Sequence, residues 1–317
     1  MKCEFSKYLA SKQQDCESLV ELLQKHYDYA SILATDVSGT SFSASRRQKA
    51  IREASLAERG FVARVYKDGL YSEYSFNVLE NVEETAKKII DELDDQLEML
   101  KAIHVEVLDT PKIEEEEAKI FVEKEVKELP DSVSFEAVMD KLTEISNKGL
   151  SLSEHLLECM ASVTMEQISK MFISQKKQLK QSYIISEGLI GALGRKGNKT
   201  QMDYQSYSGL KGAEILCEMG NDIGKVVKNV EELLDASRVE PGEYDIICTP
   251  EVAGLIAHEA FGHGVEMDMY VKNRALAKEY MGKRVASDLV EMHDGAATVE
   301  NTSSYAFDDE GTIAKTQ

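Results

Sequence analysis

A run of eleven residues constrains the local fold of this 317-residue chain more than any other feature of the sequence. The run, HEAFGHGVEMD, covers residues 258–268 and holds two of the six histidines together with three carboxylates. His258 and His263 are five positions apart, so on an ideal helix at 100° per residue they would point about 140° apart. They can face one another only where the helix ends, tightens or bulges. We expect such a break near Gly262, with Gly262 and Gly264 supplying the backbone freedom for it.

The residues before this run carry the signals of a strand followed by the start of a helix. Residues 244–248, Tyr-Asp-Ile-Ile-Cys, form a short apolar stretch that predicts a strand. Thr249 is a favourable N-cap, and Pro250 suits the first helical position. Glu251 then places a negative charge at the positive end of the helix dipole. The sequence therefore predicts that the histidines lie on a helix that leaves a strand.

His258, Glu259 and His263 are the residue types of a metal site that carries its own base. Neutral imidazoles are good ligands for zinc, and a catalytic zinc keeps one coordination position open for water. A carboxylate beside a ligand can take the proton of that water, which assigns Glu259 the role of general base. Glu266 and Asp268 fit supporting positions better than direct ligation. The alternative is that the HExxxH pattern is purely structural.

Changes in patterning divide the chain into four segments of a mixed α/β (α+β) fold. The sequence predicts an N-terminal α/β domain over residues 1–110 and a charged linker or exposed helix over residues 111–128. A central α+β domain is predicted over residues 129–238, followed by the start of a β-rich C-terminal domain over residues 239–317. Helical periodicity predicts four helices, at residues 5–27, 80–102, 134–150 and 220–237. Between them lie β-like runs, with a hairpin turn at 195–199.

Composition argues against several classes of function. A net charge of −20 disfavours binding to the phosphate backbone of nucleic acids, which depends on clustered Lys and Arg. No apolar run approaches the roughly 18–20 residues that span a membrane, and the charged N-terminus lacks the apolar core of a secretory signal. The five cysteines are scattered and form no CxxC pair. We therefore expect a cytoplasmic protein with reduced thiols, no nucleic-acid partner and no membrane partner.

Residues 254–268, GLIAHEAFGHGVEMD, resemble the signature of the TldD/PmbA family of metallopeptidases. The resemblance extends upstream to residues 241–247 and downstream to residues 308–311, and it is weaker over residues 29–93. Because the chain has the HExxxH motif, it resembles the TldD side of the family rather than the PmbA (TldE) side, which lacks the motif.

This resemblance implies a zinc-dependent peptidase that matures or degrades unstructured, linear peptides inside the cell. It implies a partner as well, either a TldE/PmbA-like subunit or further copies of the chain. By position, His258 and His263 correspond to the metal ligands and Glu259 to the catalytic glutamate.

The third metal ligand implied by the resemblance is a cysteine far downstream in the C-terminal domain. Here Cys248 is the cysteine nearest to the motif, and no cysteine follows His263. We therefore expect most of the C-terminal domain to be absent and zinc (Zn²⁺) to bind weakly or not at all, with His293 a weaker candidate for a substitute ligand. The alternative function is a truncated or catalytically inactive TldD-like subunit that serves as a binding or assembly partner.

Overall fold

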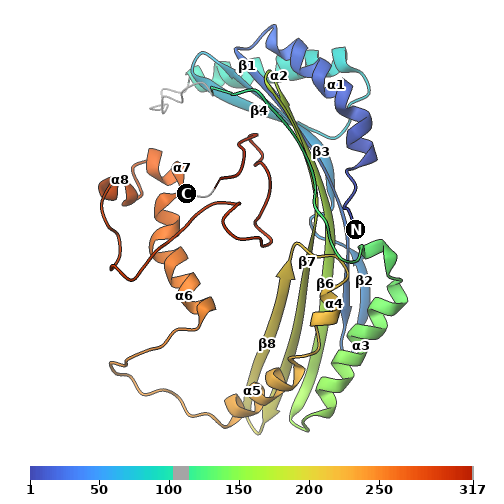
Figure 1. Ribbon diagram of the computed structural model, residues 1–317, viewed down its shortest axis with the longest axis vertical. Helices are drawn as coiled ribbons and strands as arrows, with labels where there is room; N and C mark the ends of the chain where they lie inside the picture. The colour runs from blue at the N-terminus through green and yellow to red at the C-terminus, as the bar shows by residue number, and fades with distance from the viewer. Residues whose placement is uncertain (103–113, 316–317) are drawn as a thin grey trace.

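The computed structural model describes residues 1–102 and 114–315, and its centre is one curved, eight-stranded sheet (Figure 1). The strand order is β4-β3-β1-β6-β7-β5, with β2 paired to β1 and β8 paired to β7. Every pair is antiparallel except β5–β7, which is parallel. The strands are β1 Tyr29–Ala44, β2 Lys49–Glu53, β3 Glu58–Lys67, β4 Leu70–Phe76, β5 Ala118–Glu123, β6 Leu156–Ser174, β7 Lys177–Lys196 and β8 Lys199–Gly209. The predicted mixed α/β class is confirmed.

Helices cover one face of this sheet, and their apolar stripes explain why they form there. The four predicted helices are present as α1 Lys7–Gln24, α2 Val82–Ala102, α3 Phe135–Ser151 and α5 Ile223–Asp235. Two short elements lie between them, the 3₁₀ turn η1 Pro130–Ser132 and the helix α4 Ile215–Glu218. In α5, for example, Val226, Val230 and Leu234 recur at helical spacing and are buried, while Lys228 and Glu232 between them are exposed.

Two hydrophobic cores lie side by side on the helix-covered face and share the longest strands. One joins α1 and α2 to β1, β3 and the end of β6, where Ile173 is buried. The other joins α3 and α5 to β7 and the beginning of β6, where Val163 is buried. Because side chains alternate along a strand, Phe172 points to the opposite face, where a smaller cluster forms. Strands of the predicted N-terminal and central domains thus belong to one sheet, and the domain boundaries remain predictions.

Two local predictions differ from the structure. Residues 118–123, within the predicted linker or exposed helix, form the edge strand β5. Half-buried Ile120 and Val122 alternate with exposed Lys119 and Phe121, as in a strand, and Phe121 packs edge-on against Phe5. Residues 244–248, predicted as a strand, are irregular, and Ile247 is fully exposed. An apolar run becomes a strand only where an edge is available for its backbone hydrogen bonds, and among the described residues none pairs with this one.

The segment that carries the HExxxH motif lies on the other face, across from the concave side of the sheet (Figure 1). Its elements are α6 Pro250–Ala257, η2 His258–Gly262, η3 His263–Val265, α7 Met267–Val271 and α8 Ala277–Tyr280. From α6 through α7 these elements bury no side chain. Among the described helices, none combines the length and the apolar character needed to cross a membrane.

Candidate metal centre

The helix that carries the motif begins as the sequence predicts and then changes its winding at the first histidine. Thr249 is the N-cap of α6 and Pro250 the first helical residue, although the Thr249 side chain makes no capping hydrogen bond. At His258 the α-helix gives way to a π-helical turn, in which the His263 N–H donates to the His258 carbonyl oxygen. A 3₁₀ turn follows over His263–Val265. The interruption predicted near Gly262 is confirmed.

This π-turn reconciles the five-residue spacing with a shared site. On an ideal α-helix the two histidines would be about 7.5 Å apart along the axis and about 140° apart around it. In the structure their ring centroids are 4.4 Å apart, with an interplanar angle of 69°. Ligand atoms of His258, Glu259 and His263 all lie within 4.8 Å of one another. The structure therefore brings the three predicted site residues together.

The two glycines around His263 are not what permits the break, contrary to the expectation from sequence. Gly262 has φ −55° and ψ −52°, which any residue can adopt. A Cβ atom at Gly262 would meet its nearest neighbour, the His258 ring, at an ordinary contact distance of 3.7 Å, and one at Gly264 would meet nothing within 4 Å. The widened turn rests on the i→i+5 hydrogen bond, so neither position requires glycine for its backbone.

A second carboxylate orients His263. The Glu266 Oε1 atom lies 2.8 Å from His263 Nδ1, and this hydrogen bond, followed by the charge of Glu266, raises the pKa of His263. A proton held on Nδ1 leaves the Nε2 lone pair free, and Nε2 is the atom that lies 3.9 Å from Glu259 Oε2. Asp268 instead pairs with Lys272 at 3.1 Å. Glu266 and Asp268, both expected from the sequence to be supporting residues, therefore differ in the structure: Glu266 contacts a histidine of the motif, whereas Asp268 forms an ion pair with a lysine.

The donor set fits zinc. Zinc–imidazole bonds are about 2.0–2.1 Å, so two nitrogens on one ion are at most about 4.2 Å apart. The observed limit of 4.8 Å is therefore within reach of small side-chain rotations. His293, the weaker candidate, is not a member of the cluster, and its Nε2 atom lies 2.9 Å from Glu291. Cys248 is also outside the cluster.

A hollow of about 400 Å³ lies beside the motif and was not anticipated from the sequence. Phe261 and Val265 of the motif segment line it together with Tyr280 and Met281. The sequence shows apolar residues after the motif, but their spacing does not predict that they line a common hollow.

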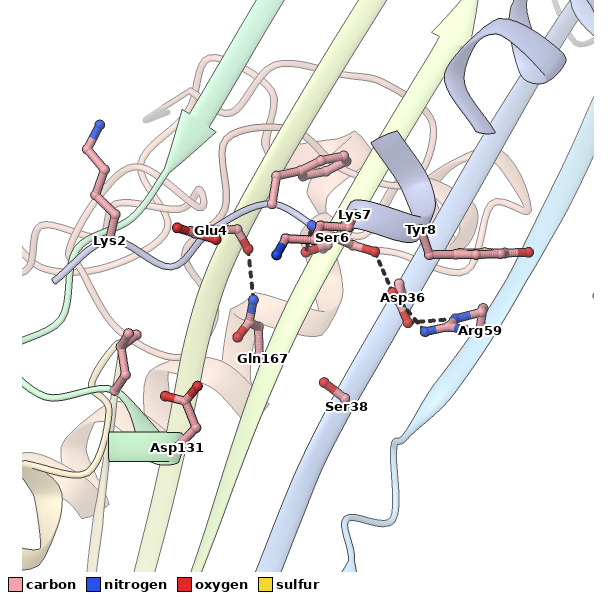
Figure 2. Close-up of a pocket in the computed structure, with 13 residues that line it drawn as sticks. Lys2, Glu4, Ser6, Lys7, Tyr8, Asp36, Ser38, Arg59, Asp131 and Gln167 are labelled. Atoms are coloured by element: carbon pink, nitrogen blue, oxygen red, sulfur yellow. Dashed lines mark hydrogen bonds and ion pairs between the residues drawn. The ribbon is translucent and has the colours of Figure 1, made fainter. Parts of the chain in front are cut away.

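A larger hollow, of about 540 Å³, lies on the helix-covered face near the start of α1 (Figure 2). Ser6 donates to Asp36, and Arg59 binds the same carboxylate at 2.9 Å. Gln167 donates to the backbone oxygen of Glu4. No residue of the HExxxH motif lines this hollow. Because Ser6, Asp36 and Arg59 in this hollow bind one another, we do not consider it a candidate reactive site.

Comparison by sequence connects the motif-bearing segment to known metallopeptidases. Residues 241–317 match the family model of the PmbA/TldA metallopeptidase C-terminal domain. A metalloprotease of Methanothermobacter thermautotrophicus is 32% identical over 130 residues, which make up 39% of this chain and 28% of that protein. A zinc metalloprotease TldD homologue of Saccharolobus solfataricus is 36% identical over 95 residues, 28% of this chain and 21% of that protein. The matched regions are thus less than a third of these relatives' lengths.

Comparison by structure extends over nearly the whole chain. A proposed modulator of DNA gyrase from Bacteroides thetaiotaomicron superimposes with a TM-score of 0.77 at 16% identity, over 97% of this chain and 69% of that one. TldE from Thermococcus kodakarensis superimposes with a TM-score of 0.61 at 14% identity, over 96% of this chain and 66% of that one. At such identities the likeness concerns the fold alone. The sequence matches and the shared fold together make the chain similar to proteins of the TldD/PmbA family, with the sequence match to the family model confined to residues 241–317.

Proposed function

We propose that this chain is the HExxxH-bearing subunit of a zinc-dependent peptidase that cleaves unstructured peptides. The observation that carries the proposal is the π-turn, which gathers His258, Glu259 and His263 within 4.8 Å. Two imidazoles and a carboxylate at that separation, on a turn that buries no side chain, are suited to bind a metal ion and to act on its water.

Each residue has a distinct role in this proposal. His258 and His263 hold the metal, and Glu266 fixes the ring orientation of His263 through their hydrogen bond. Bound zinc supplies a Lewis acid and an acidified water at this position. Glu259, which is well exposed, accepts the proton of that water and can deliver it to the leaving amine.

The surroundings of the motif support a peptide substrate. The hollow lined by Phe261, Val265, Tyr280 and Met281 adjoins the motif and fits an apolar side chain of an extended peptide. An extended peptide can present one side chain at a time to such a hollow, whereas a folded protein keeps its apolar side chains buried. Maturation or degradation of linear peptides suits this arrangement.

A partner subunit is part of the proposal. Leu255, Ile256 and Met267, which flank the histidines, are all exposed and apolar. Exposed apolar patches of this kind mark interaction surfaces, and the fold is shared with TldE. We propose a TldE/PmbA-like subunit or a second copy of the chain as the partner. The unpaired cysteines support a cytoplasmic location.

Zinc content and peptidase activity test the proposal together. The chain, alone and mixed with a TldE-like subunit, is assayed for zinc by mass spectrometry and for cleavage of an unfolded polypeptide. We expect zinc-dependent cleavage that Glu259→Gln reduces by about two to four orders of magnitude, the usual worth of a general base. Glu251→Gln, a change of the same charge at the start of α6, serves as the control and should leave activity unchanged. Zinc-free protein without cleavage under both conditions would instead identify a catalytically inactive binding subunit.

A further inference from the structure

Residues 306–311 rejoin the sheet on its concave face, opposite the helices (Figure 1). Phe307 is 1% exposed and packs against Phe172 of β6 and Leu179 of β7. Burial of a phenylalanine side chain removes a large apolar area from water and so stabilises the contact. A short segment far along the chain is thus fixed to the centre of the sheet.

The side-chain amide of Gln181 makes the hydrogen bonds to the backbone of this segment that a neighbouring strand would otherwise make. Gln181 is 1% exposed, its Nε2 atom donates to the Phe307 oxygen at 2.8 Å, and its Oε1 atom accepts from the Ala306 N–H at 2.7 Å. Both polar groups of one amide are therefore used to hold one stretch of backbone. A buried amide that lost these partners would be left without hydrogen bonds, which is destabilising, so the two bonds hold the segment to the sheet.

The turn that follows is shaped to the same surface. Asp308 Oδ1 accepts from the N–H groups of Glu310 and Thr312, which closes a tight turn. Gly311 has φ +73°, and a Cβ atom there would lie 2.3 Å from the Phe172 ring. A side chain at this position would therefore be strained and would also displace the ring that holds Phe307.

Basic side chains of the sheet form ion pairs with the carboxylates of the same turn. Lys170 lies 2.6 Å from Asp309, and Arg64 lies 2.5 Å from Glu310. Lys177 donates to the Gly311 oxygen at 2.8 Å. In a chain with a net charge of −20, these pairings match an acidic turn to a basic patch of the sheet.

The segment between α5 and this turn has few contacts of its own. From residue 236 to residue 303, Ala277 is the one buried side chain. Apart from an exposed ion pair between Glu300 and Lys124, the position of the HExxxH motif relative to the sheet therefore depends on the two ends of the segment, the end of α5 and residues 306–311.

We infer that residues 306–311 are an anchor that holds the motif-bearing segment over the concave face of the sheet. Gln181, Phe172 and Gly311 are its positioning residues. The effect on catalysis rests on the proposed function, but the anchor itself does not. It fixes where the motif lies relative to the sheet.

Hydrogen–deuterium exchange of the full chain tests the anchor with a matched pair of variants. Gly311→Ala introduces a methyl group against Phe172, whereas Gly282→Ala introduces one at a similar φ of +71° with nothing within 4 Å. We expect Gly311→Ala to speed exchange of peptides covering 304–314 by at least tenfold and Gly282→Ala by less than twofold. Exchange of the β6 and β7 amides reports whether each variant is folded.

Two further variants separate the contacts. Gln181→Met keeps the side-chain length but removes both hydrogen bonds, and it should expose the Ala306 amide to exchange. Phe172→Ala removes the ring that packs against Phe307 and should also speed exchange of peptides covering 304–314.

In an active preparation, Gly311→Ala should lower kcat about tenfold while zinc affinity stays within twofold, because no anchor residue touches a ligand. Equal exchange in Gly311→Ala and Gly282→Ala, or unprotected 304–314 amides in the unaltered chain, would overturn the inference. Those exchange results do not depend on zinc or activity, so they are independent of whether the proposed function holds.

Discussion

The π-turn makes a sharp prediction about the length of the motif. Deleting Ala260 shortens the spacing between His258 and His263 from five residues to four, which places the rings about 40° apart on an ordinary α-helix. Inserting one alanine after Ala260 lengthens the spacing to six. On an α-helix the rings would then be about 120° apart and about 9 Å apart along the axis. The deletion should therefore keep both ligands, and the insertion should lose one.

The size of the loss follows from zinc energetics. Structural zinc sites with four ligands bind with about 10–16 kcal/mol in total, or roughly 2.5–4 kcal/mol for each ligand. Losing one ligand should thus weaken zinc binding by about two to three orders of magnitude. The deletion should stay within about tenfold of the unaltered chain, since the observed ring separation of 4.4 Å is one that an i,i+4 pair also reaches.

Competition with a fluorescent zinc chelator measures these affinities directly. An alanine inserted after Gly282, where the surroundings are open, controls for lengthening the segment and should not change zinc binding. The reasoning fails if the insertion in the motif binds zinc as tightly as the unaltered chain, or if the deletion loses zinc. Either result would mean that the turn does not set the geometry of the ligands.

Two other predictions concern carboxylates with named partners. Glu266→Gln should weaken zinc binding about 10–100-fold in the chelator assay, whereas Glu291→Gln, at an equally close pair outside the cluster, should not. Burial alone would raise the pKa of Glu214, but N–H groups of Lys127, Glu128 and Gly212 outweigh it and lower that pKa. The stabilisation that ionised Glu214 gains from these N–H groups is fully present above its pKa in the unfolded chain. It is lost as pH falls through the lowered pKa of Glu214 in the folded chain. Glu214→Gln should therefore destabilise the chain by about 1–3 kcal/mol at neutral pH in urea titrations, with the difference from the unaltered chain shrinking below about pH 4.5. A difference that stays constant down to pH 3 would contradict this.

Much of the fold was accessible from local sequence signals. The four long helices follow from apolar residues at helical spacing, and the start of α6 follows from Thr249 and Pro250. The hairpin between β7 and β8 was also indicated, and Gly197 at its tip has φ +59°. Strand β5 was missed because the charged residues on either side of it dominate the composition of residues 111–128. The strand expected at residues 244–248 does not form, because an apolar run gives no information about whether an edge is free to pair with it.

The sequence by itself determined the identity of the candidate site, His258, Glu259 and His263, and required that the helix beneath them be interrupted. These are local properties, fixed by the spacing of a few residues and by the hydrogen bonds that such spacing allows. Only the tertiary structure decided that β1 pairs with β6, more than a hundred residues away, and that Phe307 is held by Gln181 on the concave face. Those contacts depend on which edges and apolar surfaces remain free once the sheet has formed, and no local pattern records that.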